Sequence, residues 1–184
     1  MLDCRSIKYK LNLTKNSGDE IGLVELATRS NYNKLLAVGG DGTVQKVVAG
    51  IILQKNMPKE EILFGLIPSG TGNDWAKSKQ IPVNISKSID LLVNGTINEQ
   101  DVGVAKIING NEMKTRYFVT YSGVGFDSFM LKRIHNYKWL GKLAYLVCAI
   151  MNFARYQNIE LKIKTSMNEI ETKIFLLGVG ICKF

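Results

Sequence analysis

The spacing of apolar residues changes along the chain, and these changes predict secondary structure. Residues 35–38 are four apolar residues in a row, which is typical of a strand buried on both faces of a parallel sheet. Three glycines then fall within residues 39–42, and apolar residues recur at helical spacing from Val44 to Ile52. This stretch therefore predicts a strand, a glycine-rich turn and a helix, in that order.

The same reasoning divides the chain into two parts near residue 95. In the first part, the patterns predict four more elements: a strand at 6–13, a helix at 19–29, a strand at 62–67 and a helix at 86–93. In the second part, they predict antiparallel strands and one buried apolar helix: strands at 96–108, 113–121, 159–165 and 170–178, and the helix at 143–150. We therefore expect an α/β domain at 1–95 and a β-rich domain at 96–184.

Both buried strands of the first part run into glycine-rich turns. The turns are Gly39-Gly40-Asp41-Gly42-Thr43 and Pro68-Ser69-Gly70-Thr71-Gly72-Asn73-Asp74. Glycine lets backbone N–H groups approach a phosphate closely, and a helix N-terminus adds a partial positive charge. Because parallel strands present their carboxyl ends on one edge, both turns are expected to converge on one anion-binding crevice.

The polar residues of the turns suit this chemistry, although each also has an ordinary structural role. Thr43 and Thr71 can offer hydroxyls to phosphate oxygens, and the Asp41 carboxylate can hold a hydrated Mg²⁺ or orient a hydroxyl group. The structural alternatives are a solvated Asp41 and helix N-caps made by Thr, Asn or Asp. Trp75 is expected to pack a helix onto the sheet rather than to stack on a base.

Composition and charge narrow the class of protein. The 184 residues are 46% apolar and 22% charged, as in ordinary globular proteins, and the net charge of +8 favours anionic partners. No base-stacking platform stands out, so nucleic acid is not an expected partner.

The three cysteines and His135 lack a metal-type spacing, and reduced thiols are expected. The longest apolar run is shorter than the roughly 20 residues that cross a bilayer, so we expect a cytoplasmic protein.

Several motifs follow one another along most of the chain. They are Thr14 with Gly18-Asp19, the two glycine-rich turns, Asp101-Val102-Gly103, and Gly123-Val124-Gly125-Phe126-Asp127. Together they resemble the soluble diacylglycerol kinase-like lipid kinases, whose relatives include sphingosine and ceramide kinases. The first turn alone is also similar to that of NAD kinases and 6-phosphofructokinases. The resemblance implies an N-terminal α/β nucleotide-binding domain with a parallel, NAD kinase-like sheet and a C-terminal β-sandwich, with ATP and Mg²⁺ between them.

The resemblance also assigns roles to single residues. By position, the residues that match nucleotide contacts are Thr14, Gly39, Gly40, Asp41, Gly42, Thr43, Val44, Gln45, Gly70, Thr71, Gly72 and Asn73. Asp41 and Asp74 match carboxylates that support catalysis, and Asp41 and Asp101 match acidic residues that organise the metal ion. The implied reaction transfers the γ-phosphoryl group of ATP to the primary hydroxyl of diacylglycerol or a similar lipid.

Three departures from the family pattern lead us to expect a fragment that is incomplete at both ends. The family usually opens with an earlier strand and an Asn-Pro turn, which would precede residue 1, and its general base would lie beyond Phe184. The family's Asn-Glu after the first turn is Gln45-Lys46 here, and Lys46 is expected to be solvated. We therefore hypothesise that this chain alone has low catalytic competence.

Two other functions stay open. One is non-catalytic binding of nucleotide or lipid, and the other is a soluble NAD kinase-like transfer to a nucleotide or sugar. A homodimer is an open alternative to the monomer, and His135 is expected to be a surface or packing residue. Contact with an anionic membrane surface is another open alternative, because basic residues are interleaved with interfacial aromatics: Lys132, Arg133, Tyr137, Lys138, Trp139 and Lys142. A solvated helix face with its Trp packed into the core explains the same pattern.

Overall fold

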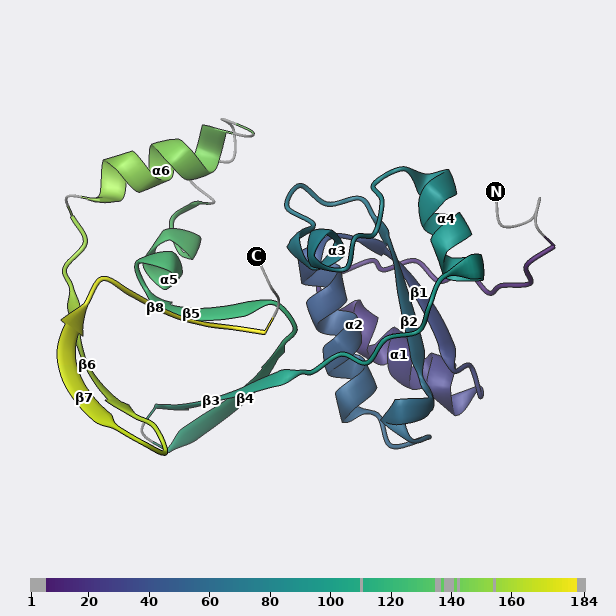
Figure 1. Ribbon diagram of the computed structural model, residues 1–184, viewed down its shortest axis with the longest axis horizontal. Coiled ribbons are helices and arrows are strands. Elements are labelled where there is room, and N and C mark those ends of the chain that lie inside the picture. The colour runs from purple at the N-terminus through teal and green to yellow at the C-terminus, as the bar shows by residue number, and fades with distance from the viewer. Residues whose placement is uncertain are drawn as a thin grey trace. The chain divides into compact units, whose positions relative to one another are not determined.

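The computed structural model describes residues 6–109, 111–134, 137, 141, 143–153 and 155–181 (Figure 1). These residues divide into two compact units. Unit 1 extends to Thr120, and Gly180 and Ile181 return to it, whereas unit 2 comprises Tyr121–Val179. The Ile181 N–H donates a hydrogen bond of 2.8 Å to Thr120 O, so the returning residues are tied to the end of unit 1.

Unit 1 contains a parallel pair of strands, β1 (Lys34–Gly39) and β2 (Leu63–Pro68). The register pairs Lys34 with Leu63 at one end and Gly39 with Pro68 at the other. The chain passes from β1 to β2 through α2 (Asp41–Leu53) and the short 3₁₀ helix η2 (Lys59–Glu61), which is the crossover that a parallel pair requires. Both strands therefore end side by side at one edge of the sheet.

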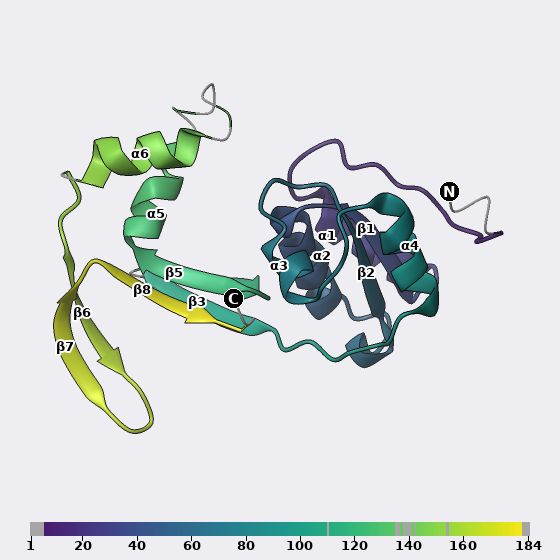
Figure 2. The ribbon, with the colours of Figure 1, turned by 45° about the horizontal axis from the view of Figure 1, so that its top comes forward.

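Helices cover the two faces of this pair. Helix α2 and helix α4 (Ile85–Asn94) lie on opposite sides of the strands in both views (Figures 1 and 2). Helix α1 (Asp19–Arg29) packs against α2, where a Cβ placed on Gly50 would lie 2.9 Å from Val24 Cβ. On the other face, Leu92 of α4 fills the space beside Gly65, and α3 (Asp74–Ser78) follows β2.

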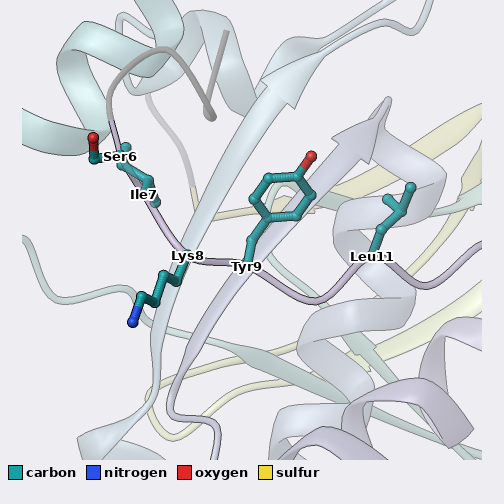
Figure 3. A pocket seen from close by; sticks show the side chains of 5 residues that line it. All are labelled: Ser6, Ile7, Lys8, Tyr9 and Leu11. Carbon is teal, nitrogen blue, oxygen red and sulfur yellow. The ribbon is translucent and has the colours of Figure 1, made fainter.

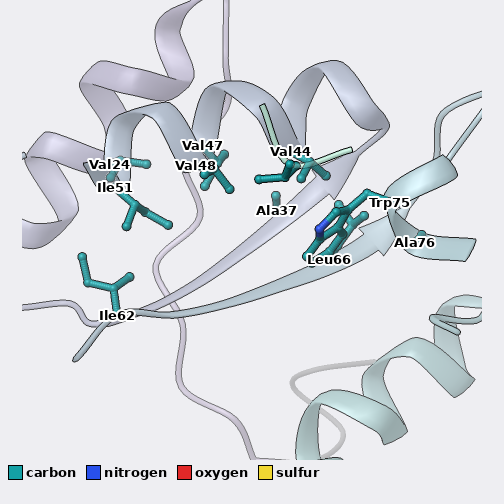
Figure 4. Packing of buried hydrophobic residues seen from close by; sticks show 11 residues of the cluster. Val24, Ala37, Val44, Val47, Val48, Ile51, Ile62, Leu66, Trp75 and Ala76 are labelled. Carbon is teal, nitrogen blue, oxygen red and sulfur yellow. The ribbon is translucent and has the colours of Figure 1, made fainter. Parts of the chain in front are cut away.

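The core of unit 1 lies between α2 and the strands (Figure 4). Its buried members are Val24, Ala37, Val44, Val47, Val48, Ile51, Ile62, Leu66, Trp75, Ala76 and Val119. The four members on α2 have the helical spacing that the sequence predicted, so this expectation is confirmed. Each buried aliphatic side chain contributes about 1.5–3 kcal/mol relative to exposure, and this packing fixes α2 on the sheet.

An antiparallel hairpin, β3 (Gly103–Asn109) and β4 (Glu112–Phe118), completes the strands of unit 1. It is joined to the α/β part, because Val119 belongs to the core and Gln45 Nε2 donates to Tyr117 O at 3.1 Å. The hairpin at 109–112 was predicted and is confirmed, although residues 96–102 belong to no strand. The division of the chain into an α/β domain at 1–95 and a β-rich domain at 96–184 stays a prediction.

Strand β1 is not buried on both faces, and this expectation was wrong. Ala37 faces the core, whereas Leu36 and Val38 on the other face are 40% and 64% exposed. Among the described residues, β1 pairs on one edge only, and α4 covers β2. A run of apolar residues therefore indicated a strand without showing which of its faces is covered.

The strand expected at 6–13 is also absent from the described structure. Residues 7–15 have no strand assignment, and Leu11 and Leu13 are more than two-thirds exposed. The stretch borders an open hollow of about 670 Å³ that is lined by Ser6, Ile7, Lys8, Tyr9 and Leu11 (Figure 3). An alternating pattern marks the face that a strand would bury, but a strand also needs a neighbour with which to pair.

Unit 2 combines two short helices with two pairs of strands. Its elements are β5 (Tyr121–Gly125), α5 (Phe126–Leu131), α6 (Ala144–Phe153), β6 (Ile159–Lys164), β7 (Glu169–Ile174) and β8 (Leu176–Gly180). Strand β5 pairs with β8, and β6 pairs antiparallel with β7. Five aromatic rings cluster beside α5, contributed by Phe126, Phe129, Phe153, Tyr156 and Phe175.

Helix α6 confirms the apolar helix expected near 143–150, but not the face that it buries. Leu146 and Ile150 are 57% and 66% exposed, whereas Cys148 and Asn152 are buried. The helix is apolar around most of its circumference, so periodicity could not choose between its faces. At the coarse level, the fold class is confirmed as α/β with a parallel pair followed by antiparallel strands.

Candidate functional site

Two glycine-rich loops meet at the carboxyl edge of the parallel strands. We name residues 39–43 the first loop and residues 69–73 the second loop. The Ser69 N–H donates to Gly39 O at 2.9 Å, and a Cβ placed on Gly40 would lie 2.9 Å from Gly70 Cα. The backbones are therefore in contact, which glycine alone permits at these positions. The predicted convergence of the two turns is confirmed.

The first loop opens directly into the N-terminus of α2. Gly40 is the N-cap, and its carbonyl accepts the N–H groups of Thr43 and Val44 at 3.0 and 3.1 Å. The N–H groups at the start of a helix have no intrahelical acceptor, and the helix dipole adds positive potential there. Gly42 is exposed, and a Cβ placed on it would meet nothing within 4 Å. This end of α2 therefore has the geometry and the free space of an anion site.

Asp41 links the two loops through its carboxylate. Its Oδ1 accepts the backbone N–H of Trp75 at 3.0 Å, and Trp75 is the second residue of α3. Its Oδ2 lies 3.0 Å from a Cβ placed on Gly72, and Asp74 Oδ2 lies 3.6 Å from the same point. One oxygen therefore caps α3, while the other shares with Asp74 the space beside Gly72.

Asn73 fixes the shape of the second loop. It has a left-handed backbone conformation with φ 53°, which Asn tolerates better than most residues, and its side chain is buried. Its Oδ1 accepts the Gly70 N–H at 3.0 Å, and its Nδ2 donates to Gly70 O at 2.8 Å. Both polar atoms of the amide are thus used within the loop, so the side chain positions Gly70 and Gly72.

Trp75 packs beneath the loops, as the sequence predicted. Its ring centroid lies 5.4 Å from that of Phe64, and its Nε1 donates to Gln100 Oε1 at 3.2 Å. Gln100 Nε2 in turn donates to Asp101 O at 2.6 Å. Asp41 therefore bonds to Trp75 directly, Asp74 precedes it in the chain, and Asp101 is linked to it through Gln100. No motif or spacing pointed to Gln100 as part of the site.

The other predicted residues are placed less centrally. Thr14 lies in the exposed stretch before α1, and Thr71 is exposed on the second loop. Val44 is fully buried in the core, and its N–H is bonded to Gly40 O. The Gln45 side chain is directed to β4, where it donates to Tyr117 O. For these last two residues, the structure shows packing and support rather than an open polar group.

Lys46 is not simply solvated, contrary to expectation. Its Nζ lies 2.8 Å from Ser17 Oγ and 3.6 Å from Glu20 Oε1. Four of the other residues considered from the sequence, His135, Lys138, Trp139 and Lys142, lie outside the described residues, as do Cys4 and Cys182. Cys148 is described, and it is a buried free thiol.

The donor set of the loops fits a magnesium ion better than a transition metal. In the described part of the chain, no three His, Cys, Asp or Glu side chains form a metal-binding group. Magnesium is commonly held by one or two carboxylates together with phosphate oxygens and water. Asp41 Oδ2 and Asp74 Oδ2 supply two such oxygens beside Gly72, and Asp74 Oδ1 also pairs with Lys77 Nζ at 3.0 Å.

These features define a class: an α/β protein in which two glycine-rich loops meet where the carboxyl ends of a parallel strand pair adjoin a helix N-terminus. Comparison with known families gives the narrower assignment. The family described as diacylglycerol kinase catalytic domain matches residues 1–105. The match covers more than half of the chain, and the chain belongs to this family.

Individual relatives agree with this assignment. A diacylglycerol kinase of Staphylococcus epidermidis is 31% identical over 175 residues, which are 90% of this chain and 50% of the relative. One from Staphylococcus aureus is 29% identical, with 91% and 50% covered. The crystal structure of a diacylglycerol kinase from Bacillus anthracis superposes with a TM-score of 0.64 at 25% identity, covering 93% of this chain and 52% of that one. The chain thus spans about half the length of its relatives.

Proposed function

We propose that this chain carries the ATP-binding loops of a lipid kinase, which transfers the γ-phosphoryl group of ATP to the primary hydroxyl of a diacylglycerol-like lipid. The observation that carries the proposal is the backbone contact between the two loops at the N-terminus of α2. The contact brings the second loop beside the N–H groups at the start of α2, where the phosphates of a nucleotide can be held. Family membership supports the choice of a lipid acceptor.

Each loop residue has a role in this proposal. The N–H groups at Asp41 and Gly42 bind phosphate oxygens, and Thr43 and Thr71 add hydroxyl donors. Asp41 and Asp74 would hold Mg²⁺ through the oxygens beside Gly72, and Asp101 would support the ion through water. When bound, Mg²⁺ neutralises phosphate charge. Thr14, Gly39, Gly40, Gly70, Gly72 and Asn73 shape or complete the nucleotide site, and Val44 and Gln45 support it from α2.

Binding is the first test, and Gly42 offers a sharp variant. Titration of the chain with Mg·ATP should saturate at one site. Gly42→Ala should weaken binding at least tenfold, since its methyl group enters the phosphate space, yet leave the melting temperature unchanged because the Cβ meets nothing there. Gly22→Ala on α1 is the matched control, since its Cβ is equally unobstructed but far from the loops. No interaction between the chain and Mg·ATP would contradict the proposal.

Turnover separates the proposal from its two alternatives. Phosphorylation of diacylglycerol in mixed micelles would show a complete kinase, whereas saturable ATP binding without turnover would favour a non-catalytic binding role. Phosphorylation of NAD or a sugar under the same conditions would favour the NAD kinase-like alternative.

A lipid acceptor implies contact with a membrane surface, and unit 2 supports this part of the proposal. Residues 128–159 contain five basic and no acidic residues, and within them α6 exposes Leu146, Ile150 and Phe153. Among the described residues, no helix is both long and apolar enough to span a bilayer. Exposed apolar side chains on a segment of net positive charge suit the surface of an anionic leaflet. Vesicles with and without anionic lipid, pelleted with the protein, would test this contact.

A further inference from the structure

A polar cluster lies where the turn before α1 meets α2. Lys46 is on the second turn of α2, and Ser17 and Glu20 are its partners. The Glu20 side chain is only 11% exposed, so its carboxylate needs a compensating charge or donor. It has both, because Oε1 faces Lys46 Nζ and Oε2 accepts the Gly18 N–H at 3.0 Å.

The turn itself is tightly organised around the start of α1. Asp19 Oδ2 accepts the N–H groups of Lys15 and Asn16, each at 2.8 Å. The Asn16 and Lys15 N–H groups hold the pKa of Asp19 below its ordinary value, as expected for a carboxylate that caps a turn. Residues 15–20 therefore form one cross-bonded turn, and Lys46 fastens it to α2.

Contacts between α2 and the segment at residues 17–21 recur at intervals of four residues. A Cβ placed on Gly50 would lie 3.2 Å from Ile21 Cα, and four residues earlier on both segments Lys46 meets Ser17. A further step of four along α2 reaches Gly42. The turn that follows Thr14 is thereby fastened to α2 one helical turn beyond the first loop.

We propose that Lys46 is a positioning residue for the nucleotide site: by pairing with Ser17 and Glu20, it fastens to α2, one helical turn beyond the first loop, the turn that follows Thr14. The inference rests on the proposed function, since it concerns the same site. It contrasts with a direct role, in which the Lys46 ammonium would bind a phosphate of ATP. In the structure that ammonium is already engaged by a hydroxyl and a carboxylate.

Charge exchange distinguishes the two roles. Lys46→Ala should raise the Kd for Mg·ATP about fivefold, the effect of one partly buried charged hydrogen bond. Lys46→Glu should raise it further, because two carboxylates would then face each other. The double variant Glu20→Lys with Lys46→Glu should recover part of the affinity lost in Lys46→Glu, since the pair is restored with its charges exchanged, although the bond from the Gly18 N–H to Glu20 Oε2 is lost. A direct phosphate contact predicts no such recovery.

Controls keep the inference separate from stability and from the function itself. Arg29→Ala removes a cation from the exposed Arg29–Glu25 pair on α1 and should leave the Kd unchanged. Melting temperatures of all variants are measured in parallel. A Kd that is unaltered in Lys46→Ala, or a double variant as weak as Lys46→Glu, would overturn the inference. If the original chain fails to bind Mg·ATP, the proposed function fails first and the inference fails with it.

Discussion

The two units differ in how much apolar side chain they bury. Among the described residues, the core cluster of unit 1 has eleven buried members, whereas that of unit 2 has three. Both loops of the candidate site run into the larger cluster, since Val44 directly follows the first loop and Trp75 lies two residues after the second loop. Functional groups must be held closely in place to be effective, and rigid packing supplies this precision. The comparison indicates that the loop geometry is set by unit 1, while unit 2 leaves apolar surface free for a partner.

Unit 2 relies more on paired surface charges. On the β6–β7 hairpin, Lys162 lies opposite Glu171, Lys164 opposite Glu169, and Glu160 opposite Lys173. Exposed ion pairs contribute only about 0–1 kcal/mol each, so these pairs fix the strand register more than they stabilise the fold.

The largest expected effect is the loss of stability when a buried side chain of unit 1 is truncated. Leu66 on β2 is 1% exposed, so Leu66→Ala should lower the free energy of unfolding by about 2–5 kcal/mol through lost burial and a cavity. Leu146→Ala on the exposed side of α6 should change it by about 0.5 kcal/mol or less. Denaturant titration measures both, and equal losses would contradict the comparison.

The second prediction concerns the contact between the loops. A Cβ on Gly70 would lie 2.6 Å from Gly40 Cα and 2.8 Å from Asn73 Oδ1, so Gly70→Ala must push the loops apart. We expect a loss of about 1–3 kcal/mol in stability and loss of measurable Mg·ATP binding. Calorimetric titration and thermal unfolding would test it, and normal binding by this variant would show that the contact is dispensable.

The third prediction distinguishes two roles of Asp41, which are capping α3 and binding magnesium. Asp41→Asn keeps an oxygen that can accept the Trp75 N–H, whereas Asp41→Ala removes it. Loss of the cap should cost about 0.5–2 kcal/mol in the alanine variant and much less in the asparagine variant. Both should lose the magnesium dependence of ATP binding. If Asp41→Asn retains that dependence, Asp41 acts only as a cap.

The smallest effect is expected in unit 2, at Tyr156. Its buried hydroxyl has no hydrogen-bond partner among the described residues, while its ring packs 5.1 Å from Phe129 and 5.3 Å from Phe126. Tyr156→Phe keeps these ring contacts and removes the unpaired hydroxyl, so stability should be unchanged or rise by about 1 kcal/mol. A clear fall in melting temperature would show that the hydroxyl has a partner in solution.

Local patterns were sufficient to predict the centre of unit 1. The strand at β1, the helix at α2 and the strand at β2 follow from spacing that is repeated within each element, and the meeting of the loops follows from their parallel order. The predictions that failed depended on contacts between residues that are far apart in the chain. Residues 6–13 have a strand pattern but form no strand in the described structure. Helix α6 is apolar on several sides, so no pattern in it shows the buried face.

Within the site, the residue types were predictable but their partners were not. Asp41 and Trp75 are 34 positions apart, and Lys46 and Ser17 are 29 apart. Such bonds depend on how α1, α2 and α3 pack, which spacing along the chain does not encode. For the same reason, Asn73 could be predicted at the site but not its role in closing the second loop on Gly70.

The placement of Trp75 gives this protein its own optical reporter. The chain has two tryptophans, and replacing Trp139 with Phe would leave Trp75 as the single tryptophan. Its backbone N–H donates to Asp41, and its indole N–H donates to Gln100. A ligand that draws the loops together would alter the polarity around that indole and shift its emission. Occupancy could then be followed by fluorescence without attaching a dye or altering the nucleotide.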